Sequence, residues 1–298
     1  MAIQWQGVLP ALTTKFTAND DLDLPLFEKN LNAQLAAGVH GVILGGTLGE
    51  ASVLKVDEKE KLVRFAVEKT MDKVPVVLNI AEGSTNEAVK QARLSKEWGA
   101  KGLMLLPPMR YKPDQRETVQ YFKTIADSTD LPIMIYNNPV DYKTEVTLDM
   151  FEELASSANI QAVKESTRDT TNVVRMHNRF GDRFKILCGV DTLAFEELCL
   201  GANGWVAGLV CAFPKETVTI YNLIQQKKYT EALAIYRWFM PLLELDIHPK
   251  LVQYIKLAET QAGIGSEFVR APRLTLTGEE RERILKIIDD GIRNRPSL

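Results

Sequence analysis

The sequence has few of the residues that build metal centres and disulfide frameworks. It contains three histidines, far apart along the chain, and three cysteines. Cys188, Cys199 and Cys211 lie in apolar surroundings and form no CxxC pair. We therefore predict buried, reduced thiols rather than disulfides or metal ligands. A histidine-based metal site is not expected, and we predict no metal.

The sequence also lacks an excess of either charge and any long apolar run. Its formal net charge is −3, which gives no electrostatic reason to expect a nucleic acid or an anionic membrane as a partner. No apolar stretch approaches the roughly 18 residues that a membrane span needs. The N-terminal segment has no basic region followed by an apolar one, so no secretory signal is expected. With 45% hydrophobic residues, the composition predicts an ordinary globular protein of the cytoplasm.

What the sequence does contain is a regular alternation of strand-like and helix-like segments. Short apolar runs predict strands at residues 7–12, 39–44, 74–80, 102–106, 132–136, 160–164, 184–188 and 204–207. Amphipathic segments predict helices at residues 24–37, 57–70 (capped by Asp57), 85–98, 113–128, 147–156, 170–178, 191–200 and 214–226. Eight such units predict an α/β fold, a closed TIM (β/α)8 barrel over residues 1–226, with a doubly wound open sheet as the alternative.

The last part of the chain has a different pattern. Helical periodicity recurs at residues 231–245, 250–262 and 278–293, without strand signals between them. We therefore predict that residues 227–298 form a C-terminal helical region packed on the barrel.

Lys164 is the residue with the clearest chemical potential. It ends an apolar run, residues 160–163, and a polar stretch that can lead into a helix follows it. Partial burial at such a strand end lowers the pKa of the ammonium group, so that a free amine can attack a carbonyl. The carboxyl ends of barrel strands are also where active sites are built. The alternative is a lysine whose amine simply reaches solvent.

Other predicted strand ends supply further polar and small residues. In the loop after the second strand, Gly46, Thr47 and Leu48 allow successive backbone N–H groups to bind a carboxylate or oxyanion, unless the loop is an ordinary glycine turn. Tyr136 ends the fifth strand, roughly 4.8 Å from the strand of Lys164, where its hydroxyl either relays protons or packs in the core.

The last two strand ends are dominated by small residues. Gly189 opens a turn in which Asp191 is expected to cap a helix, a mainly structural arrangement. Gly208 lies in a segment of small residues after the eighth strand, which leaves room for a substrate.

Four segments, in this order and spacing, resemble the dihydrodipicolinate synthase / N-acetylneuraminate lyase family of class I Schiff-base lyases. They are Gly7-Val8-Leu9-Pro10-Ala11-Leu12-Thr13-Thr14, Gly46-Thr47-Leu48-Gly49-Glu50, Tyr136-Asn137-Asn138-Pro139 and Val163-Lys164-Glu165-Ser166. The resemblance covers nearly the whole chain. It implies a (β/α)8 barrel in which Lys164 forms an imine with a 2-oxo acid, so that no cofactor is needed. It also implies a homotetramer, arranged as a dimer of dimers.

The resemblance further implies roles for individual residues. Tyr136 with Thr47 would move protons, and the backbone of Thr47 and Leu48 would hold the substrate carboxylate. The residues predicted to contact substrate are Gly46, Leu48, Asn138, Gly189 and Gly208.

Three positions depart from the family pattern. The synthase subgroup has an arginine two residues after the Y-N-x-P motif, where it binds the carboxylate of aspartate semialdehyde, and this chain has Asp141. The second threonine of the glycine loop is replaced by Leu48, which removes a hydroxyl from the usual proton relay. The family tyrosine after the fourth strand falls at Arg110 or Tyr111.

Segments 188–192, 201–204 and 213–216 look more like the 1-pyrroline-4-hydroxy-2-carboxylate deaminases of hydroxyproline breakdown. We therefore predict a deaminase, with a small 2-oxo acid or cyclic imine as substrate and with 2-oxoglutarate semialdehyde and ammonia as products. Lys164 would open the ring, and Tyr136 with Thr47 would remove a proton as the 4-hydroxyl leaves. The alternatives are a pyruvate-dependent aldolase or synthase, such as 4-hydroxy-tetrahydrodipicolinate synthase or N-acetylneuraminate lyase, and a non-catalytic carboxylate-binding barrel.

Overall fold

The structure is a computed structural model that describes residues 3–108 and 111–298. Eight parallel strands form one sheet in the order β1-β8-β7-β6-β5-β4-β3-β2, and a parallel bridge between Ala11 and Ile43 joins β1 to β2. The strands are β1 (Gly7–Pro10), β2 (Val42–Leu44), β3 (Val76–Ile80), β4 (Gly102–Leu105), β5 (Ile133–Asn137), β6 (Ile160–Glu165), β7 (Lys185–Cys188) and β8 (Gly204–Ala207). The predicted TIM barrel is confirmed.

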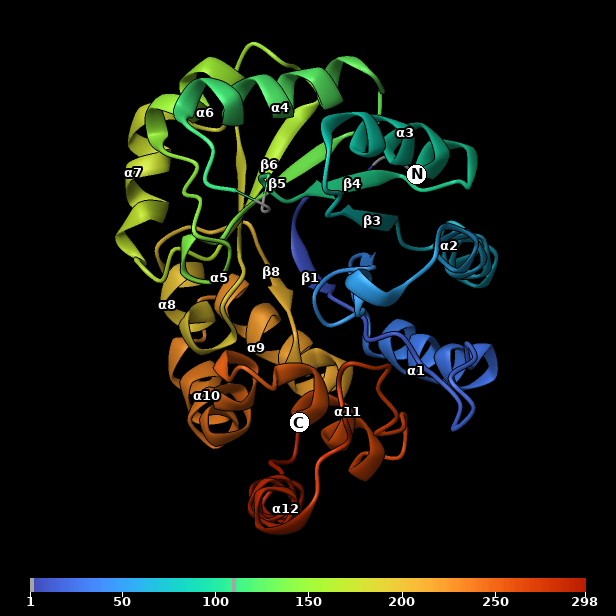
Figure 1. Cartoon of the computed structure of the whole chain (residues 1–298). Helices are drawn as coiled ribbons and strands as arrows, with labels where there is room; N and C mark the ends of the chain where they lie inside the picture. The colour runs from blue at the N-terminus through green and yellow to red at the C-terminus, as the bar shows by residue number, and fades with distance from the viewer. Residues whose placement is uncertain (1–2, 109–110) are drawn as a thin grey trace.

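Helices surround the strands (Figure 1). The α-helices are α1 (Leu24–Ala37), α2 (Val56–Thr70), α3 (Thr85–Glu97), α4 (Gln115–Asp127), α5 (Pro139–Tyr142), α6 (Leu148–Leu154), α7 (Thr171–Phe180), α8 (Ala194–Cys199), α9 (Pro214–Gln225), α10 (Tyr229–Leu243), α11 (Leu251–Gln261) and α12 (Gly278–Arg293). Four short 3₁₀ turns are η1 (Ala51–Val53), η2 (Asp191–Leu193), η3 (Leu209–Cys211) and η4 (Glu244–Ile247). None of the described helices is long and apolar enough to cross a membrane.

The C-terminal helices lie together on one side of the barrel. Figure 1 shows α10, α11 and α12, coloured orange to red, below α9. Contacts join α10 to α9 and to α12, and α11 to α12 and to η4. The turn η4 therefore connects this helical group to the carboxyl ends of the strands, and it contacts η2 after β7.

The strands are apolar on both faces because both faces are covered. Every residue of β2, β3, β4, β5 and β8 is buried, since helices cover the outside of a parallel sheet and the opposite strands cover the inside. Continuous burial explains why these segments read as apolar runs rather than as alternating patterns. It also means that any polar side chain at a strand end is held by a rigid, dry framework.

Several local expectations are corrected. Asp57 does not cap α2: the cap position is Lys55, and the side chain of Glu58 accepts a hydrogen bond from the Lys55 N–H at 2.9 Å. The single helix expected at 191–200 is split into η2 and α8. The short helix α5 was not expected; Asn138 caps it, and Pro139 supplies a fixed φ at its first position. Cys199, the last residue of α8, is exposed, whereas the other two thiols are buried.

Candidate active site

A cavity of about 470 Å³ opens among the carboxyl ends of the strands. All eight residues predicted for the site line it: Gly46, Thr47, Leu48, Tyr136, Asn138, Lys164, Gly189 and Gly208. They come from five separate strand ends, those of β2, β5, β6, β7 and β8. The barrel thus brings together residues that are up to 162 positions apart in the sequence, from Gly46 to Gly208.

Lys164 lies at the centre of this arrangement. The register between β5 and β6 places Lys164 directly beside Tyr136, and its Nζ atom lies 4.0 Å from the centroid of the Tyr136 ring. The lysine side chain is 7% exposed. Burial lowers the pKa of this amine, and the charge of Asp246 opposes the shift. The result is an amine that is more readily deprotonated than an ordinary lysine.

Gly189 gives the lysine its space. A Cβ atom at this position would lie 2.6 Å from Cε of Lys164 and 2.1 Å from Oγ of Ser166. Both distances are shorter than any real contact, so a larger residue would displace the lysine. Gly189 therefore acts at least as much on Lys164 as on a substrate.

The glycine loop after β2 forms a tight turn with free donors. The N–H groups of Glu50 and Ala51 donate back to the carbonyls of Thr47 and Gly46 at 3.1 and 3.2 Å. Within the described chain, no backbone carbonyl accepts from the N–H of Thr47 or Leu48. These two donors border the cavity, and adjacent free N–H groups of this kind bind anions.

Side chains from neighbouring elements fix the loop in place. The Thr14 hydroxyl donates to the Gly49 carbonyl at 2.7 Å, and the Asn79 amide donates to the Gly45 carbonyl at 2.9 Å. Both bonds are buried, and they hold the loop in this shape.

Asn138 connects Tyr136 to Asp141. Its amide nitrogen donates to the Tyr136 hydroxyl at 3.1 Å and to Oδ2 of Asp141 at 2.8 Å. Its side-chain oxygen accepts from the Asp141 N–H at 3.1 Å. Burial raises the pKa of Tyr136 well above that of a free phenol. The tyrosine thus keeps its proton and presents it beside Lys164, while Asn138 sets its orientation.

Tyr142 is a site residue that the sequence did not indicate. Its hydroxyl lies 2.5 Å from the Thr47 hydroxyl, and its ring packs edge-on against Tyr136, with centroids 5.5 Å apart. Lys164 and Tyr136 are both near enough to influence its pKa, which burial raises. In the sequence, the only indication of a role for Tyr142 was its position next to Asp141. It is the fold of α5 that turns the ring toward Thr47.

Asp191 and Asp246 are the second and third unexpected groups. Asp191 is fully buried and, instead of capping a helix, accepts hydrogen bonds from the Trp205 indole, the Gly208 N–H and the Leu209 N–H, at 2.8 to 3.2 Å. It fixes the end of β8. Asp246 lines the cavity from η4, in the C-terminal helical region. A search for polar residues at the ends of strands could not identify Asp246, because it follows a helix outside the eight βα units.

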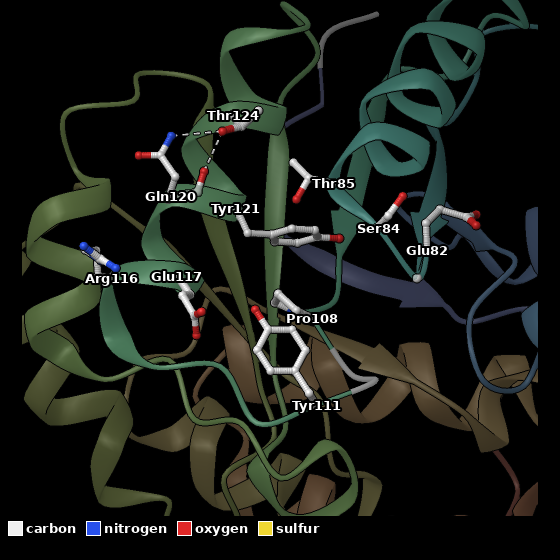
Figure 2. A pocket seen from close by; sticks show the side chains of 11 residues that line it. Glu82, Ser84, Thr85, Pro108, Tyr111, Arg116, Glu117, Gln120, Tyr121 and Thr124 are labelled. Carbon is white, nitrogen blue, oxygen red and sulfur yellow. Dashed lines mark hydrogen bonds between the residues drawn. The ribbon is translucent and has the colours of Figure 1, made fainter.

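A second cavity of about 520 Å³ lies between the starts of α3 and α4. Figure 2 shows the Tyr121 hydroxyl pointing from α4 toward Ser84, with Tyr111 and Pro108 below it. Tyr111 lines this cavity and is 58% exposed, so it is not in the lysine site; Arg110 lies outside the described residues. Among the described residues, none pairs with the buried Tyr121 hydroxyl and no lysine lines this cavity. The second cavity therefore offers no amine for imine chemistry.

The lysine cavity contains a nucleophile, proton donors and an anion-binding turn, but no metal-binding cluster. Among the described residues, no group of three or more His, Cys, Asp or Glu is arranged to hold a metal ion. A buried amine over a tyrosine ring, in the same cavity as two free N–H groups, suits attack on the carbonyl of a small carboxylic acid.

Comparison with known proteins indicates the same family that the sequence motifs resemble. The model of the "Dihydrodipicolinate synthetase family" matches residues 4–290. A 4-hydroxy-tetrahydrodipicolinate synthase from Exiguobacterium sibiricum is 32% identical over 275 residues, which cover 91% of this chain and 92% of the relative. The enzyme of the same name from Methanospirillum hungatei is 29% identical over 287 residues, with 95% and 98% covered.

Solved structures agree with these relatives. Dihydrodipicolinate synthase from Aquifex aeolicus superimposes with a TM-score of 0.91 at 28% identity, covering 95% of this chain and 97% of the other. YagE, a prophage protein of the dihydrodipicolinic acid synthase family from E. coli K12 in complex with pyruvate, gives a TM-score of 0.91 at 25% identity, with 97% and 99% covered.

These relatives overturn the preference for a deaminase over a synthase, because they are named synthases. The structure shows why the segments behind that preference carry little weight. Of residues 188–192, 201–204 and 213–216, only Gly189 and Val190 line the cavity. Phe213 is buried, and Glu216 pairs with Arg295. The residues of these segments therefore serve mainly to pack the protein and give little information about the substrate.

Proposed function

The chain belongs to the dihydrodipicolinate synthetase family, and from this premise we propose that it is a lysine-imine aldolase or synthase that joins pyruvate, or a close 2-oxo acid, to an aldehyde. One observation carries the proposal most directly: the buried amine of Lys164 faces Tyr136 in the same cavity as the free N–H groups of Thr47 and Leu48. The imine itself activates the substrate, so this chemistry needs no cofactor.

In the proposed reaction, the carboxylate of the 2-oxo acid binds the N–H groups of Thr47 and Leu48. The free amine of Lys164 attacks the keto carbon, and Tyr136 donates a proton as water leaves, which forms the imine. The imine acidifies the adjacent carbon, and loss of a proton there gives an enamine. The enamine carbon attacks the aldehyde, whose oxygen takes up the proton. Hydrolysis then releases a 4-hydroxy-2-oxo acid and restores the amine.

Thr47 and Tyr142 extend the proposed proton path. The short contact between their hydroxyls and the packing of Tyr142 on Tyr136 place three hydroxyl groups around the lysine. Leu48 provides no hydroxyl, and Tyr142 of the same chain offers one close by. Asn138 acts as a positioning residue, because it binds the Tyr136 hydroxyl directly.

A finer candidate is the reaction of the named relatives, 4-hydroxy-tetrahydrodipicolinate synthase, in which the aldehyde is aspartate semialdehyde. Overall sequence similarity supports it. The carboxylate at position 141 does not help to bind the carboxylate of that aldehyde. The homotetramer remains a prediction, since one solved relative is described as a monomeric dihydrodipicolinate synthase variant.

Borohydride trapping tests the proposal. Incubation of the full chain with pyruvate and a borohydride reductant should add the mass of the reduced adduct to the peptide that contains Lys164. Lys164→Ala should lose the label, because no other lysine lines the cavity. The exposed Lys215 provides the matched control, and Lys215→Ala should be labelled like the wild type. An unlabelled wild-type protein, or equal labelling of Lys164→Ala, would refute the imine mechanism.

A further inference from the structure

Ser166 carries a buried hydroxyl group that the fold leaves unpaired. The residue directly follows β6 and lines the lysine cavity. It is 1% exposed, and its N–H donates to the Asn137 carbonyl at 2.9 Å. Among the described residues, however, none forms a hydrogen bond with its side-chain oxygen. Because most buried polar groups in proteins are paired, this hydroxyl needs an explanation.

The unpaired hydroxyl of Ser166 weakens the fold. Folding removes water from the group and supplies no new partner in exchange, which is unfavourable. An alanine at the same position would avoid this loss. Features that a protein keeps at the expense of its stability are typical of functional sites. Since Ser166 borders a cavity, a ligand bound there can supply the missing partner.

The hydroxyl also lies beside the groups that react. A Cβ atom built on Gly189 would lie 2.1 Å from Oγ of Ser166 and 2.6 Å from Cε of Lys164. These two atoms therefore border the same small space. Burial raises the pKa of Tyr136, and Ser166 is close enough to oppose that shift. The serine hydroxyl is thus near both the lysine amine and the tyrosine hydroxyl.

The other hydroxyl groups of the cavity already have partners. Tyr142 lies in hydrogen-bond contact with Thr47, and the Tyr136 hydroxyl accepts from Asn138. In the proposed reaction the substrate carboxylate binds the free N–H groups of the glycine loop, which leaves its keto oxygen without a donor. That oxygen gains negative charge as the amine adds, and a fixed donor aimed at it stabilises the transition state. Ser166 is placed to be this donor.

The step that needs this donor is the formation of the imine. Nζ of the free Lys164 amine bonds to the keto carbon, and the carbon–oxygen double bond becomes a single bond. One proton moves from the nitrogen to this oxygen and gives a neutral carbinolamine. The new hydroxyl group then leaves as water with a second proton, supplied by Tyr136. The nitrogen forms the double bond to carbon, which yields a protonated imine and a tyrosine phenolate.

We propose that Ser166 is a catalytic residue whose hydroxyl donates a hydrogen bond to the oxygen on the reacting carbon while Lys164 forms the imine. This inference rests on the proposed function, since it concerns the first step at the same site. Gly189 supports the arrangement, because the absence of a side chain there leaves the space in which the serine, the lysine and this oxygen meet.

Rapid quenching tests the proposal. The full chain is mixed with pyruvate, borohydride is added after varied times, and mass spectrometry measures the reduced adduct on the Lys164 peptide. Ser166→Ala should lower the limiting rate of imine formation at saturating pyruvate roughly 10- to 100-fold. The pyruvate concentration that gives half of this rate should change little, because the N–H groups that bind the carboxylate remain.

Ser266 provides the matched control. Its hydroxyl is also buried, no described residue pairs with it, and it does not line the lysine cavity. Both alanine variants should melt at or above the wild-type temperature, because each removes an unpaired buried hydroxyl. Only Ser166→Ala should slow imine formation. If Ser166→Ala fails to fold, Ser166→Cys decides in its place and should also be slow, because a thiol of similar shape is a weaker donor.

The outcomes separate this inference from the proposed function. If the wild type forms no adduct with pyruvate, the proposed function fails, and this inference fails with it. If the wild type is labelled and the Ser166 variant forms the imine at the same limiting rate, only the inference is overturned. It is also overturned if Ser266→Ala is slowed equally, or if the Ser166 variant changes only the half-saturating pyruvate concentration.

Discussion

At the scale of single residues, the site depends on how the surroundings change ordinary side chains. Lys164 is chemically useful because burial disfavours its charged form, and Asp246 moderates that shift. Tyr136 keeps its proton because burial disfavours the phenolate. A phenol that keeps its proton thus lies beside an amine that loses its proton more readily than an ordinary lysine, as a proton donor and a nucleophile require. Neither property follows from the residue type alone.

Tyr136→Phe tests the proton-donor role. The substitution removes the hydroxyl and keeps the ring against Lys164, so turnover should fall roughly 100-fold or more, while imine trapping persists at a reduced rate. Tyr121→Phe is the matched control, because it removes a buried hydroxyl to which no described residue hydrogen-bonds and which lies in the other cavity (Figure 2). It should retain wild-type turnover. Near-normal turnover of Tyr136→Phe would assign this tyrosine to packing.

At the scale of elements, the glycine loop is tied to the C-terminal helices by buried ion pairs. The Lys256 amine on α11 donates to Glu50, the last residue before η1, at 2.5 Å, and both side chains are fully buried. Glu50 also accepts from the Arg270 N–H at 3.0 Å. On the next turn of α11, Glu259 pairs with Lys15 after β1 at 2.8 Å. The helix thus holds two of the loops that border the site.

Lys256→Met should destabilise the fold strongly. It removes the nearer of two cations that pair with the buried Glu50 and leaves only Arg273, at 3.8 Å. Loss of one partner of a buried pair costs about 3–5 kcal/mol in comparable cases, and KM for pyruvate should rise because the loop loses its anchor. Urea unfolding measures the first effect and steady-state kinetics the second.

The double variant Glu50→Gln/Lys256→Met should recover part of the lost stability, because no unpaired charge remains. Lys61→Met breaks an exposed pair with Asp57 and should cost less than about 1 kcal/mol. If Lys256→Met is as stable as the Lys61→Met control, the buried pair does not anchor the loop.

At the scale of the whole molecule, buried acids connect stability to pH. Glu197 on α8 is fully buried, and among the described residues no N–H or O–H group donates to its oxygens, although the Cys188 thiol lies close to it. Burial raises its pKa from 4.5 to about 8, with Glu165 adding to the shift. The folded state therefore binds a proton that the unfolded chain releases above about pH 4.5. The stability from this group is complete below that pH and is lost as the pH rises through about 8.

Glu197→Gln should remove this dependence. The wild type and the variant should melt at similar temperatures near pH 5, and the variant should become relatively more stable toward pH 8. In a protein of this size, roughly 2–4 °C corresponds to each kcal/mol. Glu196→Gln, at the exposed neighbouring position, should follow the wild type at every pH. Parallel melting curves for wild type and Glu197→Gln would contradict the raised pKa.

The sequence by itself determined the order and type of the elements. The spacing of hydrophobic residues along the chain is a local property. Eight apolar runs with amphipathic segments between them were therefore sufficient to predict the barrel. The same reasoning placed Thr47, Tyr136, Lys164 and their neighbours at strand ends, and all of the predicted residues meet in one cavity. The boundaries that failed, at Asp57 and at residues 191–200, are places where capping or a tertiary contact decides the local conformation.

Only the tertiary structure decided which distant residues complete the site. Asp246 enters from a turn after α10, Tyr142 reaches Thr47 across 95 positions, and Gly208 is small because Asp246 needs its space. Lys256 and Glu50 pair across 206 positions. Such contacts leave no periodic signal in the chain, because they depend on the closure of the barrel and on how the C-terminal helices pack against it. The strand ends supply Lys164 and the glycine loop, and the packing of that last region brings Asp246 into the same cavity.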